Sequence, residues 1–212
     1  MKNRFRDLKY QEKKFWRFAK KQPVKIQNIL QAAFALAKRA HAGQTRDEGD
    51  PYFIHPLRVA LFLIGDLKIK NYDIICSALL HDVVEDGDIS LVAIKKQFGP
   101  AIGVLVKNLT RERPKNETEE AKKISKGRKY RAILRSDKNT RIIKCADMLD
   151  NLRSMPFIPT THPTRRKFPR WFEEAKKYDL PLAHKTNTKM VVEMTIALNQ
   201  AKKILPPPLT NN

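Results

Sequence analysis

The chain has 212 residues, and its 43 Lys and Arg outnumber its 22 Asp and Glu, which gives a formal net charge of +21. No apolar run approaches the ~20 residues that cross a bilayer, and the charged N-terminus leads into no apolar segment typical of a signal peptide. We therefore expect no membrane partner. A charge this large indicates a polyanionic substrate, a nucleic-acid partner or simply solubility, and charge alone does not choose among them.

Residues 1–22 form a basic N-terminal extension, in which lysines and arginines are interleaved with the aromatic residues Phe5, Tyr10, Phe15, Trp16 and Phe18. Such a mixture can bind RNA. The alternative, which we favour, is a helix that packs its aromatic side chains against the protein and leaves its lysines in water. A nucleic-acid partner thus stays open but is not favoured.

Apolar residues recur at helical spacing along the rest of the chain. The pattern predicts helices over residues 24–40, 52–64, 74–86, 90–98, 100–110, 130–135, 139–154, 171–178 and 186–205. Residues 41–51 and 156–169 read as loops, and residues 111–129 as a mobile loop or a frayed helix start. No segment alternates like a strand, and no glycine-rich phosphate loop is present. The expected fold is all-α, a single domain of about ten helices over residues 23–205, followed by a tail at 206–212.

The predicted helix over residues 74–86 carries the pattern of greatest chemical interest. Its last two turns divide into an apolar and an ionisable side: Leu79, Leu80, Val83 and Val84 against His81, Asp82, Glu85 and Asp86. A surface helix with a wet acidic face would explain this division. The apolar residues Ile74, Ile75 and Ala78, however, extend along the polar side one turn upstream, so the helix is expected to be buried. Buried carboxylates are tolerated when they are paired or bind a metal, which makes this a candidate site.

A second predicted helix, over residues 139–154, also gathers polar side chains on one face: Lys144, Asp147, Asp150, Asn151 and Ser154. Taken alone, this face would be a solvated one. Three further side chains change that interpretation, because His55 and the His81–Asp82 pair stand in apolar surroundings on other helices. Together with Asp147 they make two imidazoles and two carboxylates, a set that can hold one divalent ion and leave positions open for water.

Three stretches resemble the hydrolase domain of RelA/SpoT proteins, and most closely the stand-alone small alarmone hydrolases. They are HAGQTRDEGDPYFIH at residues 41–55, HDVVED at 81–86 and KCADMLDNLRS at 144–154. The resemblance implies an HD-superfamily helical domain and a bound manganese ion (Mn²⁺). It also implies that a small nucleotide is the substrate: the 3′-pyrophosphate of (p)ppGpp would be hydrolysed to leave GDP or GTP, which lowers the stringent-response signal.

By position, the resemblance implies a role for each of nine residues. The metal ligands would be His55, His81, Asp82 and Asp147. The pair that positions and activates the attacking water would be Glu85 and Asp86, and the substrate contacts would be Arg46, Asn151 and Ser154. From the residues themselves we add Lys144 for the phosphates, and in second place the basic cluster of residues 122–131, for which a solvated run of charge is an equal alternative.

The sequence departs from the family at Asp47, where a basic residue usually follows the arginine. An anion there would repel phosphates or remove a stacking partner for guanine. A second hypothesis is therefore an HD-fold phosphohydrolase of another nucleotide, for example one that removes the 2′-phosphate of NADPH. A third is a basic RNA- or ribosome-binding module with a vestigial HD site, and the complete ligand set argues against it.

The remaining polar residues of note are expected to have structural roles. His41 is predicted to stabilise its loop, and Arg153 to form an ion pair away from the site. Cys76 and Cys145 lie in apolar helical contexts, which fits buried free thiols in a reducing compartment and makes the cytoplasm the expected location.

Overall fold

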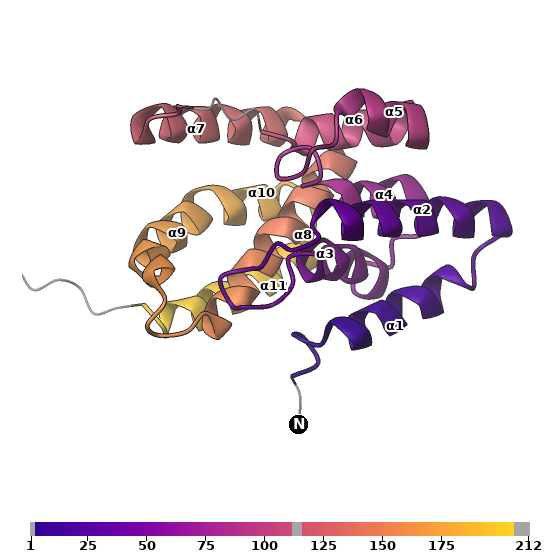
Figure 1. Ribbon diagram of the computed structural model, residues 1–212. Helices are drawn as coiled ribbons and strands as arrows, with labels where there is room; N and C mark the ends of the chain where they lie inside the picture. Colours follow the sequence, from indigo (N-terminus) through magenta and orange to yellow (C-terminus); the bar gives the residue numbers. More distant parts are fainter. Residues whose placement is uncertain (1–2, 112–115, 206–212) are drawn as a thin grey trace, which may run out of the picture.

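The computed structural model describes residues 3–111 and 116–205, and in these parts of the chain the regular elements are all helical (Figure 1). The α-helices are α1 (Leu8–Ala19), α2 (Val24–Ala40), α3 (Ile54–Gly65), α4 (Tyr72–Leu80), α5 (Leu91–Phe98), α6 (Pro100–Leu109), α7 (Glu119–Arg135), α8 (Lys138–Ser154), α9 (Phe168–Glu174), α10 (Leu180–His184) and α11 (Thr188–Lys202). Short 3₁₀ helices at Met155–Phe157 and Pro163–Lys167, and a π-helical turn at Ala175–Asp179, join the last of them. The all-α prediction is confirmed.

Helices α3, α4 and α8 form the centre of the molecule and position the polar residues of interest. Every residue from Ile54 to Leu63 and from Ile74 to Leu80 is buried, and full burial of a Leu or Ile side chain typically contributes about 1.5–3 kcal/mol. Helix α8 runs through the middle of the bundle (Figure 1), with α3 and α4 on one side and α11 packed against it as well. Apolar packing therefore carries the polar ends of α3 and α4 into the interior.

The central helix is shorter than predicted. Helix α4 ends at Leu80, and residues 81–86 form a succession of turns in place of the two further helical turns expected. The cause is local, because the Nδ1–H of His81 donates to the carbonyl oxygen of Ala78 at 2.7 Å and so satisfies a group at the helix end. After the turns, Gly87 is required for space, since a Cβ atom there would lie 2.7 Å from the carbonyl oxygen of Val83.

Helix α7 is longer than predicted, because the segment expected as a loop or frayed start is helical from Glu119 onward. Thr118 caps it by accepting a hydrogen bond from the backbone N–H of Ala121 at 3.2 Å, and Glu119 and Glu120 favour the positive end of the helix dipole. Of its side chains only Ile133 is buried. The helix therefore lacks the apolar period that sequence patterns detect.

Three of the aromatic residues of the N-terminal extension, Phe15, Trp16 and Phe18, pack in or against the core, as the favoured interpretation predicted. The side chain of Phe15 is fully buried, and its ring lies 5.3 Å from that of Phe34 on α2. The ring of Trp16 lies 4.8 Å from the same ring. The domain boundaries at residues 22 and 205 stay predictions, and the tail at 206–212 lies outside the described residues.

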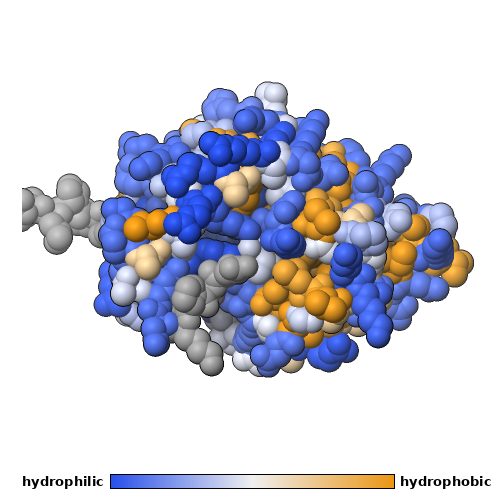
Figure 2. All heavy atoms as spheres, turned by 90° about the horizontal axis from the view of Figure 1, so that it is seen from above, coloured by the Kyte–Doolittle hydropathy of each residue, from blue (hydrophilic) through white to orange (hydrophobic). Residues whose placement is uncertain are grey.

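The surface is mainly hydrophilic in the view of Figure 2, with apolar residues gathered in a patch on that face. Among the described residues, no helix has both the length and the apolar character that a membrane crossing requires. Cys76 and Cys145 are free and buried, as predicted, and burial raises the pKa of each thiol to about 12. The cytoplasmic location inferred from these thiols stays a prediction.

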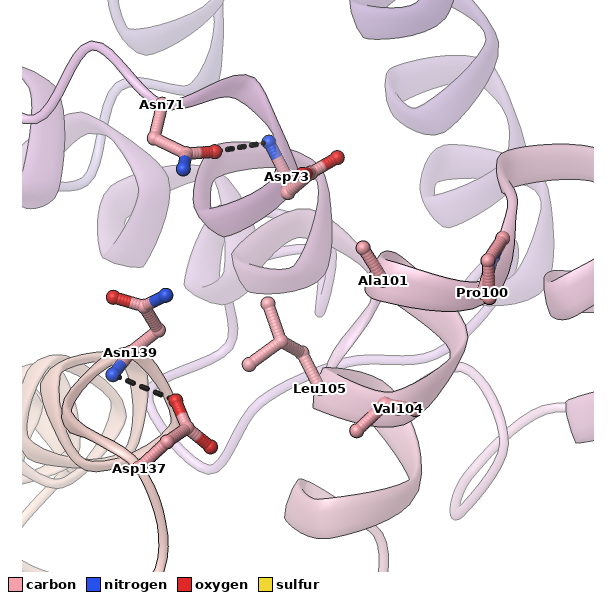
Figure 3. Close-up of a pocket in the computed structure, with 8 residues that line it drawn as sticks. All are labelled: Asn71, Asp73, Pro100, Ala101, Val104, Leu105, Asp137 and Asn139. Carbon is pink, nitrogen blue, oxygen red and sulfur yellow. Dashed lines mark hydrogen bonds between the residues drawn. The ribbon is translucent and has the colours of Figure 1, made fainter.

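A surface pocket of about 400 Å³ lies between the starts of α4 and α8 and helix α6 (Figure 3). Two of its polar side chains cap helices, since Asn71 accepts from the N–H of Asp73 and Asp137 from the N–H of Asn139, each at 2.8 Å. None of the lining residues belongs to the predicted site. The site predicted from the sequence therefore lies in another part of the fold than this pocket.

Candidate metal centre

Four side chains predicted as metal ligands converge on one point between α3, α4 and α8. The Nε2 atom of His55, in the first turn of α3, lies 3.7 Å from Oδ2 of Asp82 and 3.2 Å from Oδ1 of Asp147. The Nε2 atom of His81, immediately after α4, lies 3.3 Å from Oδ2 of Asp82 and 3.8 Å from Oδ1 of Asp147. The structure thus brings together residues that are up to 92 positions apart in the chain.

These separations suit the coordination shell of a small divalent ion. Ligand atoms at about 2.1 Å from an octahedral ion are about 3.0 Å from each other along the edges of the octahedron. The four nitrogen–oxygen separations between the histidines and the aspartates, 3.2 to 3.8 Å, are slightly longer. Ligand atoms of His55, His81 and Asp82 all lie within 4.8 Å of one another, and Asp147 contacts this group through the two histidines. All four residues are at least largely buried, with exposed side-chain fractions of 2%, 3%, 17% and 7% for His55, His81, Asp82 and Asp147.

Both imidazoles are oriented by a hydrogen bond through the other ring nitrogen. Nδ1 of His81 lies 2.7 Å from the carbonyl oxygen of Ala78, and Nδ1 of His55 lies 2.7 Å from Oδ2 of Asp150. Each acceptor requires a proton on Nδ1, so in the neutral ring the Nε2 lone pair points into the cluster. Nε2 of His81 is buried and has no hydrogen-bond partner among the described residues. This nitrogen is a ready ligand for a metal.

Charges around the cluster favour ionised carboxylates. Burial alone would raise the pKa of Asp147, but Lys144 and the two histidines lower it well below its ordinary value. Burial likewise opposes the charged form of His81, yet Asp82 and Asp147 raise the pKa of this imidazole to about 9. When no cation is bound, His81 is therefore expected to carry a proton on both ring nitrogens at neutral pH. A metal ion that binds Nε2 must displace the proton on that nitrogen.

Glu85 and Asp86, the predicted acid–base pair, lie in the turns beside the ligands. Oε2 of Glu85 accepts a hydrogen bond from the backbone N–H of Arg111 at 3.0 Å. Oδ2 of Asp86 lies 3.2 Å from the hydroxyl of Tyr52, which is also 3.0 Å from Oδ2 of Asp82. Burial and these two carboxylates raise the pKa of Tyr52, so the phenol stays protonated and can donate.

Three of the four side chains predicted to contact the substrate lie around the candidate metal ligands. Nζ of Lys144 lies 2.6 Å from Oδ2 of Asp147, and the side-chain amide of Asn151 donates to Oδ1 of Asp147 at 2.8 Å. Arg46, in the loop before α3, donates to the amide oxygen of Asn151 at 2.9 Å. Ser154 differs, because it is 1% exposed and its hydroxyl accepts a hydrogen bond from Arg58 at 2.8 Å. The structure therefore places Ser154 behind the site and not at its opening.

The sequence interpretation assigned no role in the site to Asp150, Arg58 or Tyr52. Arg58 forms a two-pronged ion pair with Asp150, with its Nε and Nη2 atoms 2.8 and 2.9 Å from the two carboxylate oxygens. Spacing carried a signal for both, since Arg58 follows His55 by three residues and Asp150 follows Asp147 by three. Residues so spaced share a helix face. Tyr52 lies in a loop, where no periodicity applies.

The minor assignments are confirmed. Nδ1 of His41 lies 2.9 Å from the side-chain oxygen of Gln44, which stabilises the loop after α2. Arg153 forms its ion pair with Glu193 of α11 at 2.7 Å.

Asp179, in the π-helical turn, gives a testable pH dependence. Burial raises its pKa to about 7, although Lys144 opposes the shift. Because the pKa in the folded state exceeds the ordinary value of 3.8, the folded protein retains a proton that the unfolded chain releases as the pH rises between these values. The free energy of unfolding therefore falls over that range.

We expect Asp179→Asn to stabilise the metal-free protein by about 1–3 kcal/mol at pH 8 and to leave it unchanged near pH 4; partial exposure of the side chain screens the full shift. Urea unfolding at both pH values measures this, with the exposed Glu173→Gln as the control. Equal effects of Asp179→Asn at the two pH values would contradict it.

Comparison with known proteins identifies the type of domain. A family model described as an HD domain matches residues 33–171. A solved structure titled as a metazoan ortholog of SpoT that hydrolyses ppGpp superposes with a TM-score of 0.71 at 29% identity, covering 84% of this chain and 96% of that one. That structure is of similar length to the matched part of this chain.

Longer bacterial proteins are similar over the same region. The chain is 36% identical over 160 residues to a probable GTP pyrophosphokinase of Mycobacterium leprae, and 31% identical over 157 residues to the bifunctional (p)ppGpp synthase/hydrolase SpoT of Escherichia coli. Each match covers 74% of this chain but only 19% and 21% of the relative. The chain thus spans about a fifth of the length of these curated relatives.

Proposed function

We propose that this chain, which belongs to the HD domain family, is a manganese-dependent hydrolase that removes the 3′-pyrophosphate of ppGpp and pppGpp. The observation that carries the proposal is the convergence of two imidazole nitrogens and two carboxylate oxygens beside Glu85 and Asp86. The substrate class is supported by the similarity to a metazoan ortholog of SpoT that hydrolyses ppGpp. We further propose that the enzyme works in the cytoplasm.

The ligand set would hold the metal through His55, His81, Asp82 and Asp147. A bound divalent ion lowers the pKa of a coordinated water from about 15.7 toward neutrality and so provides hydroxide at neutral pH. Mixed imidazole and carboxylate ligands are compatible with several divalent metals, and the family resemblance favours manganese among them. Lys144 and Asn151 hold Asp147 by its two oxygens and thereby keep Oδ1 directed at the histidines.

Glu85 and Asp86 are proposed to handle the proton of the attacking water. Glu85 would accept that proton while its other oxygen keeps the hydrogen bond from Arg111. Asp86, hydrogen-bonded to Tyr52, would orient the water. The water oxygen would form a bond to the phosphorus next to the 3′ oxygen, the bond from that phosphorus to the 3′ oxygen would break, and the 3′ oxygen would take up a proton.

Cations around the opening would neutralise the pyrophosphate. Arg46 and Lys144 are the nearest, and their side chains are already held by Asn151 and Asp147. The basic cluster of residues 122–131 lies on α7, and the Lys129 ammonium of that helix donates to the carbonyl of Thr110, next to the Arg111 that contacts Glu85. This contact places part of the cluster beside the acid–base pair and supports its proposed contribution to phosphate binding.

A second candidate substrate is favoured by one observation. Asp47 is exposed and adjoins Arg46, so an anion stands where the family usually has a basic residue. Repulsion there would weaken the binding of a guanosine polyphosphate. The 2′-phosphate of NADPH is the alternative group that the enzyme would remove.

The experiment is product analysis with purified protein, Mn²⁺ and a panel of ppGpp, pppGpp and NADPH, each with a parallel reaction in EDTA. The proposal expects stoichiometric pyrophosphate and GDP or GTP from the first two nucleotides and none in EDTA. Release of inorganic phosphate from NADPH alone would replace this function by the alternative. Absence of metal-dependent products from all three would overturn the hydrolase assignment.

A further inference from the structure

The N-terminal segment of residues 3–11 supports the metal centre from behind, and we propose that Phe5, Arg6 and Arg58 are positioning residues of this enzyme. The inference rests on the proposed function, since it takes His55 as a metal ligand and Arg46 as a substrate contact. It assigns the segment a task other than the binding of nucleic acid. It is carried by a continuous series of side-chain contacts from the segment to the ligand.

The series begins at His55, whose orientation depends on Asp150. The imidazole donates to Oδ2 of Asp150 at 2.7 Å, and the carboxylate is itself held by two hydrogen bonds from Arg58. Nη2 of Arg58 also donates to the buried hydroxyl of Ser154. The position of Arg58 therefore determines the position of His55.

Phe5 closes the outer side of this arrangement. The guanidinium carbon of Arg58 lies 4.0 Å from the centre of the Phe5 ring, which in turn stacks on Phe157 at 5.5 Å. The side-chain amide of Gln11, which is 6% exposed, donates to the backbone carbonyl oxygen of Arg4 at 2.8 Å. The beginning of the segment is thus tied to α1, and its ring covers the face of the guanidinium that the protein interior does not contact.

A pocket of about 110 Å³ lies beside this ion pair. It is partly open to solvent, and its lining includes Phe5, Gln11, Arg58 and Asp150. Removal of the phenyl ring would widen this pocket and expose more of the ion pair to water. Water weakens the Arg58–Asp150 attraction and competes for the same hydrogen bonds. His55 would then lose its fixed partner.

Arg6 reaches a different part of the site. Its guanidinium pairs with Asp50 at 2.9 and 3.0 Å and donates to the backbone carbonyl oxygen of Glu48 at 2.7 Å. Glu48 is 4% exposed, and its carboxylate accepts from Nε of Arg46 at 3.0 Å. Arg6 therefore fixes the loop that holds Arg46. Through Phe5 the segment supports the orientation of the proposed metal ligand His55, and through Arg6 it supports that of the proposed substrate contact Arg46.

The test measures Mn²⁺ binding to metal-free full-length protein by calorimetry, together with kcat and KM for ppGpp. Phe5→Ala is expected to raise the Kd for Mn²⁺ about fivefold, equivalent to about 1 kcal/mol, a typical cation–π contribution. Phe5→Tyr, which keeps an aromatic face, should restore it. Arg6→Ala should raise KM about three- to tenfold and change the Kd for Mn²⁺ less than twofold.

Two controls separate positioning from a general loss of stability. Lys9→Ala removes an exposed charge from the same N-terminal segment and should leave both constants unchanged. Asp150→Asn should weaken Mn²⁺ binding about 10–100-fold, the usual effect of losing a partner of a ligating histidine. Circular dichroism confirms that each variant is folded at the assay temperature.

The outcomes distinguish the two proposals. If the wild-type chain binds no Mn²⁺, the proposed function fails and this inference fails with it. If the wild-type chain binds Mn²⁺ and folded Phe5→Ala binds it equally well, only the positioning role is overturned. The positioning role is also overturned if Phe5→Ala and Lys9→Ala weaken Mn²⁺ binding equally.

Discussion

Replacement of Asp82 by alanine is expected to abolish Mn²⁺ binding and pyrophosphate release together. Oδ2 of Asp82 and Oδ1 of Asp147 each lie within 3.8 Å of the Nε2 atoms of both His55 and His81. Without this oxygen the two imidazoles retain Asp147 alone as a charged co-ligand. Three ligands with one negative charge hold a divalent ion far less tightly than four with two.

Asp147→Ala should give the same result, and metal content by mass spectrometry after dialysis measures both. Asp88→Ala is the matched control, because it removes one carboxylate from the same segment as Asp82 but from an exposed position. Full metal stoichiometry in Asp82→Ala or Asp147→Ala would refute the ligand assignment.

Replacement of Glu85 by alanine is expected to leave metal binding intact and to lower kcat about 10²–10⁴-fold, the range for loss of a general base. The carboxylate adjoins the ligands in the turns after α4 without being one of them, and its contact with the N–H of Arg111 orients it. Rapid-quench measurement of pyrophosphate release, with Mn²⁺ affinity measured in parallel, tests both halves of the expectation.

Glu85→Gln distinguishes proton transfer from simple positioning. A glutamine oxygen can still accept the hydrogen bond from Arg111, but an amide does not take up a proton near neutral pH. We expect this variant to be as slow as Glu85→Ala. Wild-type turnover in Glu85→Gln would remove the residue from the proton transfer.

The sequence could single out the candidate metal ligands because their surroundings made them unusual. His55 and the His81–Asp82 pair interrupt apolar stretches, and buried ionisable groups need a partner or a metal. That argument does not depend on where a helix ends, so it holds although α4 ends earlier than predicted. The roles of these residues, and of Glu85 and Asp86, remain predictions that the experiments above test.

What the sequence could not supply was the pairing between helices. Arg58 and Asp150 each read as one polar residue on a helix face, and nothing in a single sequence states that α3 and α8 bring them to 2.8 Å. The burial of Ser154 and its contact with Arg58 were not evident for the same reason, and its role as a substrate contact stays a prediction. The contact of Phe5 with Arg58 joins two residues that are 53 positions apart in the chain.

The end of α4 has a consequence for how this centre could be altered. The His81 imidazole bonds the Ala78 carbonyl at the end of the helix through one nitrogen, and its other nitrogen is the one proposed to bind the metal. A change of His81 would remove a proposed metal ligand. It would also remove the hydrogen bond to Ala78, so the helix could continue and the Asp82 carboxylate would point in another direction. The same side chain therefore affects both the length of α4 and the proposed metal binding, so a change of His81 is expected to alter both.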